Sequence, residues 1–192
     1  LETSGGTVVI DPYLDGSVPG LVPIRLKADA VYCSHDHRDH GAREVVALTG
    51  KTSDIAVEEI HTWHDAQQGA QRGPDTIRVF QAEGLRVAHL GDLGCVPEPE
   101  QMEALKGLDA LMVPVGGFYT IDAGQAKALV DQLQPRVTIP MHYRSETFGY
   151  DVIGPLEDYL ALCQNVVRYP DNVLVLDRDT PAQTAVLTYC PQ

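Results

Sequence analysis

The sequence predicts a layered α/β sandwich, and three observations support this fold class. Short β-branched and apolar segments dominate the first half of the chain, whereas segments with helical spacing follow in the second half. The 192 residues are enough for one full-sized hydrophobic core. The chain shows no internal repeat, low-complexity tract or linker that would divide it. We therefore expect one domain over residues 1–192.

Strands are predicted where short runs of apolar or β-branched residues lie between turn signals. The clearest pair is a hairpin of segments 76–82 and 85–90, joined by the turn residues Glu83 and Gly84. The remaining expected strands are 7–10, 30–33, 55–60, 110–115, 137–140, 173–176 and 184–189.

The clearest predicted helix covers residues 122–133. Asp122 and Gln125 have the spacing of a capping box at its start, and Pro135 follows its end. One apolar face is formed by Ala126, Leu129, Val130 and Leu133. Shorter helices are expected over 41–48, 100–106 and 156–163.

Composition narrows the classes of partner. The net charge of −13 opposes binding to a phosphate backbone, so we expect a small-molecule substrate and no nucleic acid. No apolar run approaches the ~18–20 residues of a membrane span, and no signal-peptide pattern is present. The four cysteines form no CxxC pair, which argues against a disulfide framework. A cytoplasmic location is the expectation.

Residues 35–40 read HDHRDH and place three imidazoles and two carboxylates together. The motif HxHxDH offers His35, His37, Asp39 and His40 as metal ligands, directly after a predicted strand. Imidazole and carboxylate ligands suit zinc, manganese or iron. Three further candidates, His64, Asp92 and His142, follow other predicted strands. Seven ligands suit two divalent ions that share one carboxylate and leave positions for water and substrate.

The order HxHxDH…H…D…H resembles the metallo-β-lactamase superfamily. The stretches VVIDPY (8–13), HDAQQGAQRG (64–73), LRVAHLGDLG (85–94), MVPVGGFYTID (112–122) and TIPMHYR (138–144) resemble its small metal-dependent hydrolases related to ascorbate-6-phosphate lactonase. The resemblance implies a four-layer αββα sandwich with a dinuclear site at one edge of two facing sheets. Two departures are that the family's additional first strand is absent before residue 1 and that the interval between His40 and His64 is short.

The resemblance also implies a role for each candidate ligand. His35, His37 and His64 would hold the first metal, and Asp39, His40 and His142 the second. Asp92 would bridge the two ions, for which zinc is the first expectation and manganese or iron the alternatives. Asp92 and Asp39 are the predicted catalytic residues.

Other polar residues near these motifs have less certain roles. Asp36 and Asp65 are expected either to orient imidazoles or to be solvated. Asp11 would lie near the site or form a turn, His89 would be packed beside the site, and His61 matches no ligand position. Expected substrate contacts are Tyr119, Thr120, Tyr143 and Arg144. Arg144 would pair with a phosphate or carboxylate, or else bond to its own loop.

The predicted activity is metal-assisted hydrolysis of an ester, lactone or phosphoester of a small metabolite. One alternative is an iron-dependent oxidoreductase on the same scaffold, although the diiron reductases usually have HxExDH, with glutamate where this chain has His37. Another is a non-catalytic metal-binding module. A homo-oligomer is also expected to be feasible, because the absent first strand would leave an exposed sheet edge.

Overall fold

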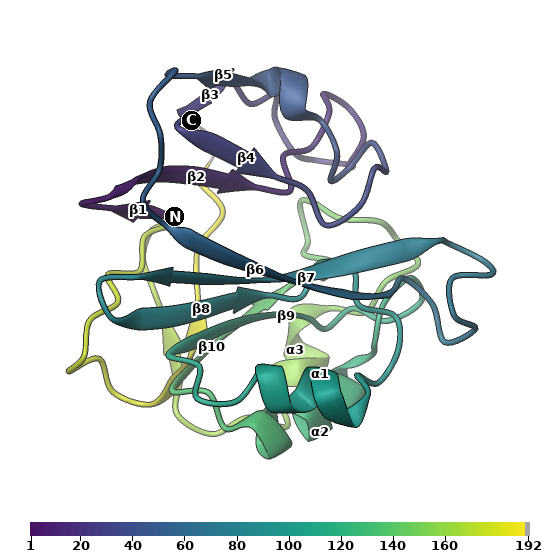
Figure 1. Cartoon of the computed structure of the whole chain (residues 1–192). Helices are drawn as coiled ribbons and strands as arrows, with labels where there is room; N and C mark the ends of the chain where they lie inside the picture. Colours follow the sequence, from purple (N-terminus) through teal and green to yellow (C-terminus); the bar gives the residue numbers. More distant parts are fainter. Residues whose placement is uncertain (191–192) are drawn as a thin grey trace.

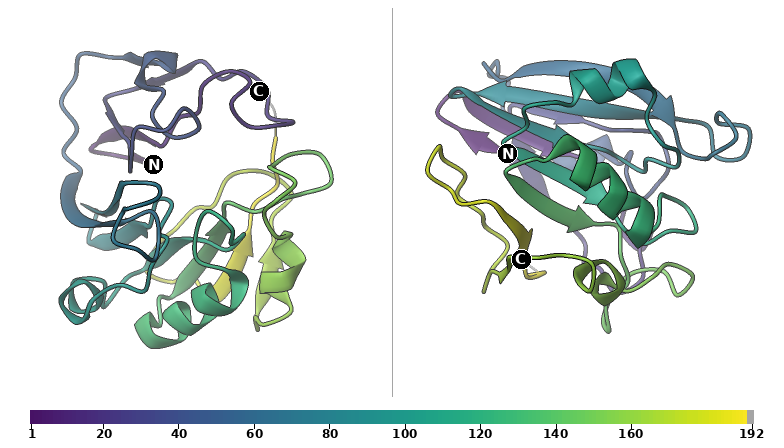
Figure 2. Two further views of the ribbon diagram at one scale, coloured as in Figure 1. Left: turned by 90° about the vertical axis from the view of Figure 1, so that its right-hand side faces the viewer. Right: turned by 90° about the horizontal axis from the view of Figure 1, so that it is seen from below.

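The computed structural model describes residues 1–190, which form stacked layers (Figure 1). Two small sheets from the first quarter of the chain lie over one face of a large mixed sheet, and three helices cover the opposite face (Figures 1 and 2). This arrangement confirms the expected α/β sandwich. Over the outer face of the small sheets, the helical layer is reduced to the short 3₁₀ helix η1 (Arg43–Val45).

The small sheets are built from very short strands. One contains β1, β2 and β4 in that order, and the other pairs β3 with β5 in parallel. Their bounds are β1 (Glu2–Thr3), β2 (Gly6–Ile10), β3 (Leu26–Ala28), β4 (Ala30–Tyr32) and β5 (Val46–Leu48). Strands β2 and β4 run parallel, with Val8 opposite Ala30.

The large sheet has the strand order β11-β12-β10-β9-β8-β7-β6. Its strands are β6 (Ala56–Trp63), β7 (Pro74–Ala82), β8 (Leu85–His89), β9 (Ala110–Pro114), β10 (Val137–Met141), β11 (Val166–Arg168) and β12 (Gln183–Val186). Strands β8 to β12 run parallel, whereas β7 is antiparallel to both β6 and β8. Strand β6 therefore points in the same direction as β8, β9 and β10.

The three helices are α1 (Pro99–Ala104), α2 (Ala123–Leu133) and α3 (Leu156–Leu160). Asp122 caps α2 as the sequence predicts, because its Oδ1 accepts from the backbone N–H of Gln125 at 2.8 Å. The reciprocal bond from Asp122 N–H to Gln125 Oε1 is 3.0 Å long and completes the capping box. Two buried positions of α2, Ala126 and Leu129, pack in a core with Leu111 of β9.

Apolar side chains fill both spaces between the layers. The helix-side core contains fully buried residues of the central strands, such as Ile77, Val79 and Leu111. The opposite face of β7 contributes Phe80, which packs with Val8 of β2 and Ile55 under the small sheets. Alternation along β7 thus supplies both cores. None of the helices in the described part of the chain is long and apolar enough to cross a membrane.

Two predicted elements are wrong. Segment 41–48 is a 3₁₀ turn followed by strand β5, because Val46 pairs with Leu26 of β3 and is buried against the outer face of the small sheets. The β-branched pair at 45–46 thus fits a strand better than a helix. Segment 173–176 is irregular, with Val175 largely exposed. Strands β1, β3 and β11 were not predicted, since each has only two or three residues.

Candidate metal centre

The candidate ligands lie in loops at the carboxyl ends of strands. The motif of residues 35–40 follows β4, His64 follows β6, Asp92 follows β8 and His142 follows β10. Because β6, β8 and β10 point in the same direction, their carboxyl ends lie at one edge of the large sheet. Loops at this edge are where open α/β sheets commonly bind ligands. The topology therefore collects residues from 35 to 142 into one cluster.

The carboxylate of Asp92 lies at the centre of this cluster and is almost completely buried. The Nε2 atoms of three imidazoles lie within 3.3 Å of its oxygens, at 3.3 Å for His40, 3.2 Å for His64 and 3.3 Å for His142. His35 Nε2 is slightly farther away, at 4.0 Å. One carboxylate thus faces four ring nitrogens from three separate loops, those after β4, β6 and β10.

Three sets of ligand atoms are mutually close enough to share an ion. Within each set the atoms lie within 4.8 Å of one another, and the sets are His35–His37–His64, His35–Asp39–His40 and His40–Asp92–His142. The first set is the one expected for the first metal. Asp39 is grouped with His35 and His40, whereas the sequence places it with His40 and His142. All seven predicted ligands are therefore brought together.

Unpartnered polar atoms at the centre of the cluster fit a bound cation. Nε2 of His35 and Oδ1 of Asp92 are buried and have no hydrogen-bond partner. Buried polar atoms are rarely left in this state, because the lost hydration costs about 1–3 kcal/mol per group. Imidazole nitrogens and carboxylate oxygens are suitable ligands for zinc, manganese or iron. The residues present thus fit the two ions that the sequence implies.

The cluster shifts the pKa values of its own members. Burial alone would raise the pKa of Asp92, but the imidazoles of His142 and His40 outweigh this and hold it well below its usual range. Burial would lower the pKa of His40, but Asp92 and Asp11 raise it to about 9. By contrast, burial and two neighbouring imidazoles lower the pKa of His37. Asp92 is consequently an ionised acceptor at neutral pH.

Polar residues behind the ligands fix the ring orientations. Asp11 lies 3.0 Å from Nδ1 of His40 and accepts from the hydroxyl of Ser34 at 2.6 Å. Ser34 Oγ is in turn 2.9 Å from Nδ1 of His35. His64 Nδ1 lies 3.1 Å from the carbonyl oxygen of Tyr119. Such outer partners normally set which ring nitrogen faces a metal.

Sequence reasoning did not identify Asp75. Its side chain is fully buried at the start of β7, which is antiparallel to β8 and so begins at the edge where the ligands lie. Oδ1 of Asp75 lies 3.5 Å from His35 Nδ1 and accepts from the backbone N–H of Asp92 at 3.2 Å. Asp75 thus positions both residues. Its only sequence signal is a carboxylate beside Pro74 at the start of an apolar strand.

Two predicted outer partners have other contacts. Asp65 does not orient an imidazole, because its carboxylate accepts from the backbone N–H groups of Gln67, Gly69, Gln71 and Arg72. Asp65 therefore stabilises the loop that follows His64 through these four hydrogen bonds. Asp36 is exposed, which is the solvated alternative, and pairs with Arg43 at 3.0 Å. His89 is buried and accepts from Gly91 N–H, and His61 lies exposed on β6, away from the cluster.

Close backbone packing around Asp92 requires glycine on both sides. A Cβ at Gly91, whose φ is +55°, would collide with the Asp75 carboxylate and with Ser34. A Cβ at Gly94 would collide with the backbone of His64. The GDLG segment can approach its neighbours this closely only because both positions lack a side chain.

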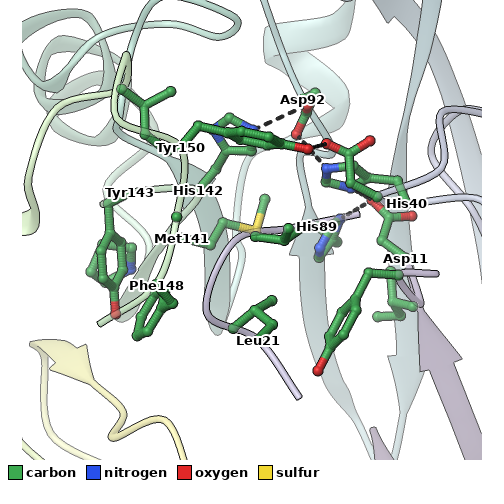
Figure 3. A pocket seen from close by; sticks show the side chains of 17 residues that line it. Asp11, Leu21, His40, His89, Asp92, Met141, His142, Tyr143, Phe148 and Tyr150 are labelled. Atoms are coloured by element: carbon green, nitrogen blue, oxygen red, sulfur yellow. Dashed lines mark hydrogen bonds and ion pairs between the residues drawn. The ribbon is translucent and has the colours of Figure 1, made fainter. Parts of the chain in front are cut away.

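Of the four predicted substrate contacts, two lie near the cluster or its cavity, and the side chains of the other two are bonded to their own loops. The Tyr119 ring centroid lies 6.5 Å from that of His142, and Tyr143 lines a cavity beside the cluster (Figure 3). The Thr120 hydroxyl donates to the carbonyl of Ile121. The Arg144 side chain donates to the carbonyl of Ile153 at 3.2 Å, which is the loop-bonded alternative.

Comparison with known proteins agrees with this fold. Residues 1–142 match the family model of the β-lactamase superfamily domain, so the chain belongs to the metallo-β-lactamase superfamily. A crystal structure of a candidate Zn-dependent hydrolase of this superfamily from Thermotoga maritima is 31% identical, with a TM-score of 0.75 over 97% of this chain and 91% of that chain.

Curated relatives also cover most of the chain. A metal-dependent hydrolase of Staphylothermus marinus is 26% identical over 92% of this chain and 88% of its own length. A metal-dependent hydrolase of Archaeoglobus fulgidus is 29% identical over 72% of this chain and 76% of its own length.

Proposed function

We propose that the protein is a metal-dependent hydrolase that uses two divalent ions to cleave an ester, lactone or phosphoester bond of a small metabolite. One observation carries the proposal: the buried Asp92 carboxylate faces four imidazole nitrogens within 4.0 Å, and its Oδ1 lacks a hydrogen-bond partner. The names of the relatives as metal-dependent hydrolases support the same class. Zinc is the proposed metal, with manganese or iron as alternatives.

The proposed ligand assignment follows the sequence motif. His35, His37 and His64 would hold the first ion, a grouping that their mutual proximity supports. Asp39, His40 and His142 would hold the second, and Asp92 would be the ligand that the two ions share. Bound ions of this kind lower the pKa of a water molecule and polarise the bond to be cleaved.

The protein side chains orient the reacting groups. Asp92 is held in place by Asp75, which accepts from its backbone N–H, and is kept ionised by His142 and His40. Its buried, unpartnered Oδ1 would serve as a metal ligand, which is the catalytic role proposed for this carboxylate. Asp39, the second proposed catalytic carboxylate, lines the cavity beside Asp92. Tyr119 and Tyr143 remain the proposed substrate contacts, whereas Thr120 and Arg144 bond to their own loops.

The acidic composition supports a small-molecule substrate rather than nucleic acid. We also propose that the protein is located in the cytoplasm and is related to the ascorbate-6-phosphate lactonase branch. It could form a homo-oligomer.

The test combines metal analysis with a substrate panel. We expect about two zinc or manganese ions per chain, and hydrolysis of at least one ester, lactone or phosphoester that a chelator abolishes and added metal restores. His35→Ala should lose metal and activity, whereas the matched control His61→Ala, at an exposed histidine outside the cluster, should lose neither. One iron per chain with oxygen consumption and no hydrolysis would overturn the proposal in favour of an oxidoreductase. Full metal loading without any turnover would favour a non-catalytic module.

A further inference from the structure

A cavity of about 340 Å³ opens beside one half of the ligand cluster. Asp39, His40, Asp92 and His142 line one end of it. Figure 3 shows His40, Asp92 and His142 close together there, with Leu21 and Phe148 at some distance along the cavity wall. The half of the cluster proposed to hold the second metal thus faces a partly open cavity.

The cavity wall is mainly apolar away from the cluster. Its apolar and aromatic lining residues include Tyr13, Val18, Leu21, Met141, Phe148 and Tyr150. Among the described residues that line the cavity there is no lysine or arginine. Pockets of this size with few polar groups are typical of sites for small organic ligands.

Most polar atoms of this wall already have partners within the protein. The hydroxyl of Tyr13 donates to the carbonyl of Val22 at 2.7 Å, and that of Tyr150 donates to the carbonyl of Ser17 at 2.5 Å. The oxygens of Asp11 accept from Ser34. The unpartnered buried atoms on the lining residues, Asp92 Oδ1 and His142 Nδ1, belong to the cluster itself. A ligand would therefore find polar contacts at the cluster and apolar contacts in the rest of the cavity.

This distribution of polarity discriminates between substrate classes. An anionic substituent in the cavity would lose hydration without gaining a cationic partner, which is unfavourable. An uncharged apolar substituent would gain from burial. We infer that the substrate is a neutral ester or lactone whose carbonyl lies at the cluster and whose apolar substituent fills this cavity; the inference rests on the proposed hydrolase function. A substrate whose substituent carries a charged group does not fit this cavity.

The two loops that form much of the wall hold each other in place. Gly149 N–H donates to the carbonyl of Pro19 at 3.0 Å, and a Cβ at Gly20 would collide with the carbonyl of Thr147. The space corresponds to the volume of about eleven water molecules at ~30 Å³ each. A substituent of medium length is therefore the expected occupant.

The test measures binding of the carboxylates that such hydrolysis would release. Calorimetry on the zinc-loaded protein should show that the Kd tightens from acetate through butyrate and hexanoate to octanoate, by about fourfold per buried methylene. Leu21→Gln should flatten this series, because it puts an amide into the apolar wall. The matched control Leu48→Gln, at a leucine that is 60% exposed on β5, should leave the series unchanged.

If Leu21→Gln does not fold, a second variant of the cavity wall tests the same inference. Val18→Thr conserves side-chain volume and should weaken octanoate several-fold while leaving acetate unchanged. A Kd that does not depend on chain length, or the same dependence in both cavity variants as in the wild type, would overturn the inference. Chain-length dependence without hydrolysis of any substrate would refute the hydrolase proposal, and the inferred substrate with it, and would leave only an apolar ligand site in the cavity. Hydrolysis that favours phosphoesters over neutral esters would refute only the inference.

Discussion

The hydroxyl of Tyr150 lies 3.3 Å from Oδ2 of Asp39 and 2.5 Å from the carbonyl oxygen of Ser17. Tyr150 belongs to the loop after β10, whereas Asp39 belongs to the HxHxDH motif after β4. Burial and the nearby Asp39 raise the pKa of Tyr150 to about 12, so the hydroxyl stays protonated at neutral pH. The single hydroxyl proton faces both acceptors, so Tyr150 can hold the Asp39 carboxylate through a bifurcated hydrogen bond.

Replacing Tyr150 with phenylalanine should weaken binding of the second metal. The ring and the cavity wall remain, but Asp39 loses a hydrogen-bond donor, and losses of this kind cost about ten- to a hundredfold in metal affinity. Stepwise zinc titration measures this effect. The control is Tyr13→Phe, since its hydroxyl lines the same cavity but donates to the carbonyl of Val22. Equal zinc affinities for the second step in the two variants would show that Tyr150 does not position Asp39.

Asp92→Asn should reduce turnover by more than about a hundredfold and preserve the fold. Asparagine has nearly the same shape, but it removes the charge that faces four imidazoles and leaves one oxygen to bridge two ions. The comparison must be made at equal metal loading, with circular dichroism as the check of folding. Unchanged turnover under these conditions would refute the catalytic and bridging role of Asp92.

Asp65→Asn should loosen the loop 66–73 selectively. The carboxylate accepts four backbone N–H groups, two on each oxygen, whereas an amide offers one oxygen and turns two N–H groups toward backbone donors. Hydrogen exchange should show reduced protection of the amides of Gln67, Gly69, Gln71 and Arg72. Amides of the central strand β9 serve as the internal reference. Protection equal to that of the wild type at all four amides would show that the Asp65 carboxylate does not stabilise this loop.

Asp29 should stabilise the small sheets in a pH-dependent way. Its carboxylate accepts from Thr49 Oγ1 and from Thr7 N–H, and these bonds lower its pKa from the usual 3.8. A folded-state pKa below the unfolded one means that the stabilisation is present above pH 3.8 and is lost as the pH falls through the folded value.

Urea unfolding of the wild type and of Asp29→Asn checks this pH dependence. The wild type should be more stable at pH 7, and the difference should shrink as the pH falls below about 3.8. Glu2→Gln on β1 controls for the loss of one negative charge. A difference that stays constant down to pH 3 would show that ionisation of Asp29 contributes nothing.

Sequence patterns within a few residues predicted the elements that are stabilised by contacts between neighbours in the chain. The capping box of Asp122 and Gln125 and the hairpin turn at Glu83 both form as expected. The wrong helix at 41–48 shows the limit of such patterns, because Val46 adopts a strand only by pairing with Leu26, twenty residues earlier. Strand pairing of this kind is not visible in a short window of sequence.

The cluster was predictable because its residues follow strands that end at one edge. The outer partners were less visible. Asp75 reaches His35 only because β7 is antiparallel to β8, and Ser34 bonds to Asp11 from a loop 23 residues later in the chain. The apolar cavity was not predicted either, since it exists between two loops whose contact depends on the tertiary fold.

The hydrogen bond between Gly149 and Pro19 and the close approach of Gly20 to Thr147 restrain the two loops of the cavity wall against each other. A restrained wall selects ligands by shape, because it resists moving apart for a bulkier group. It also loses little conformational entropy when a group of matching shape enters. Straight and branched acyl groups with the same number of carbons should therefore be distinguished, although their hydrophobicity is nearly equal. The specificity of this protein would then depend on the outline of the acyl group as much as on its size.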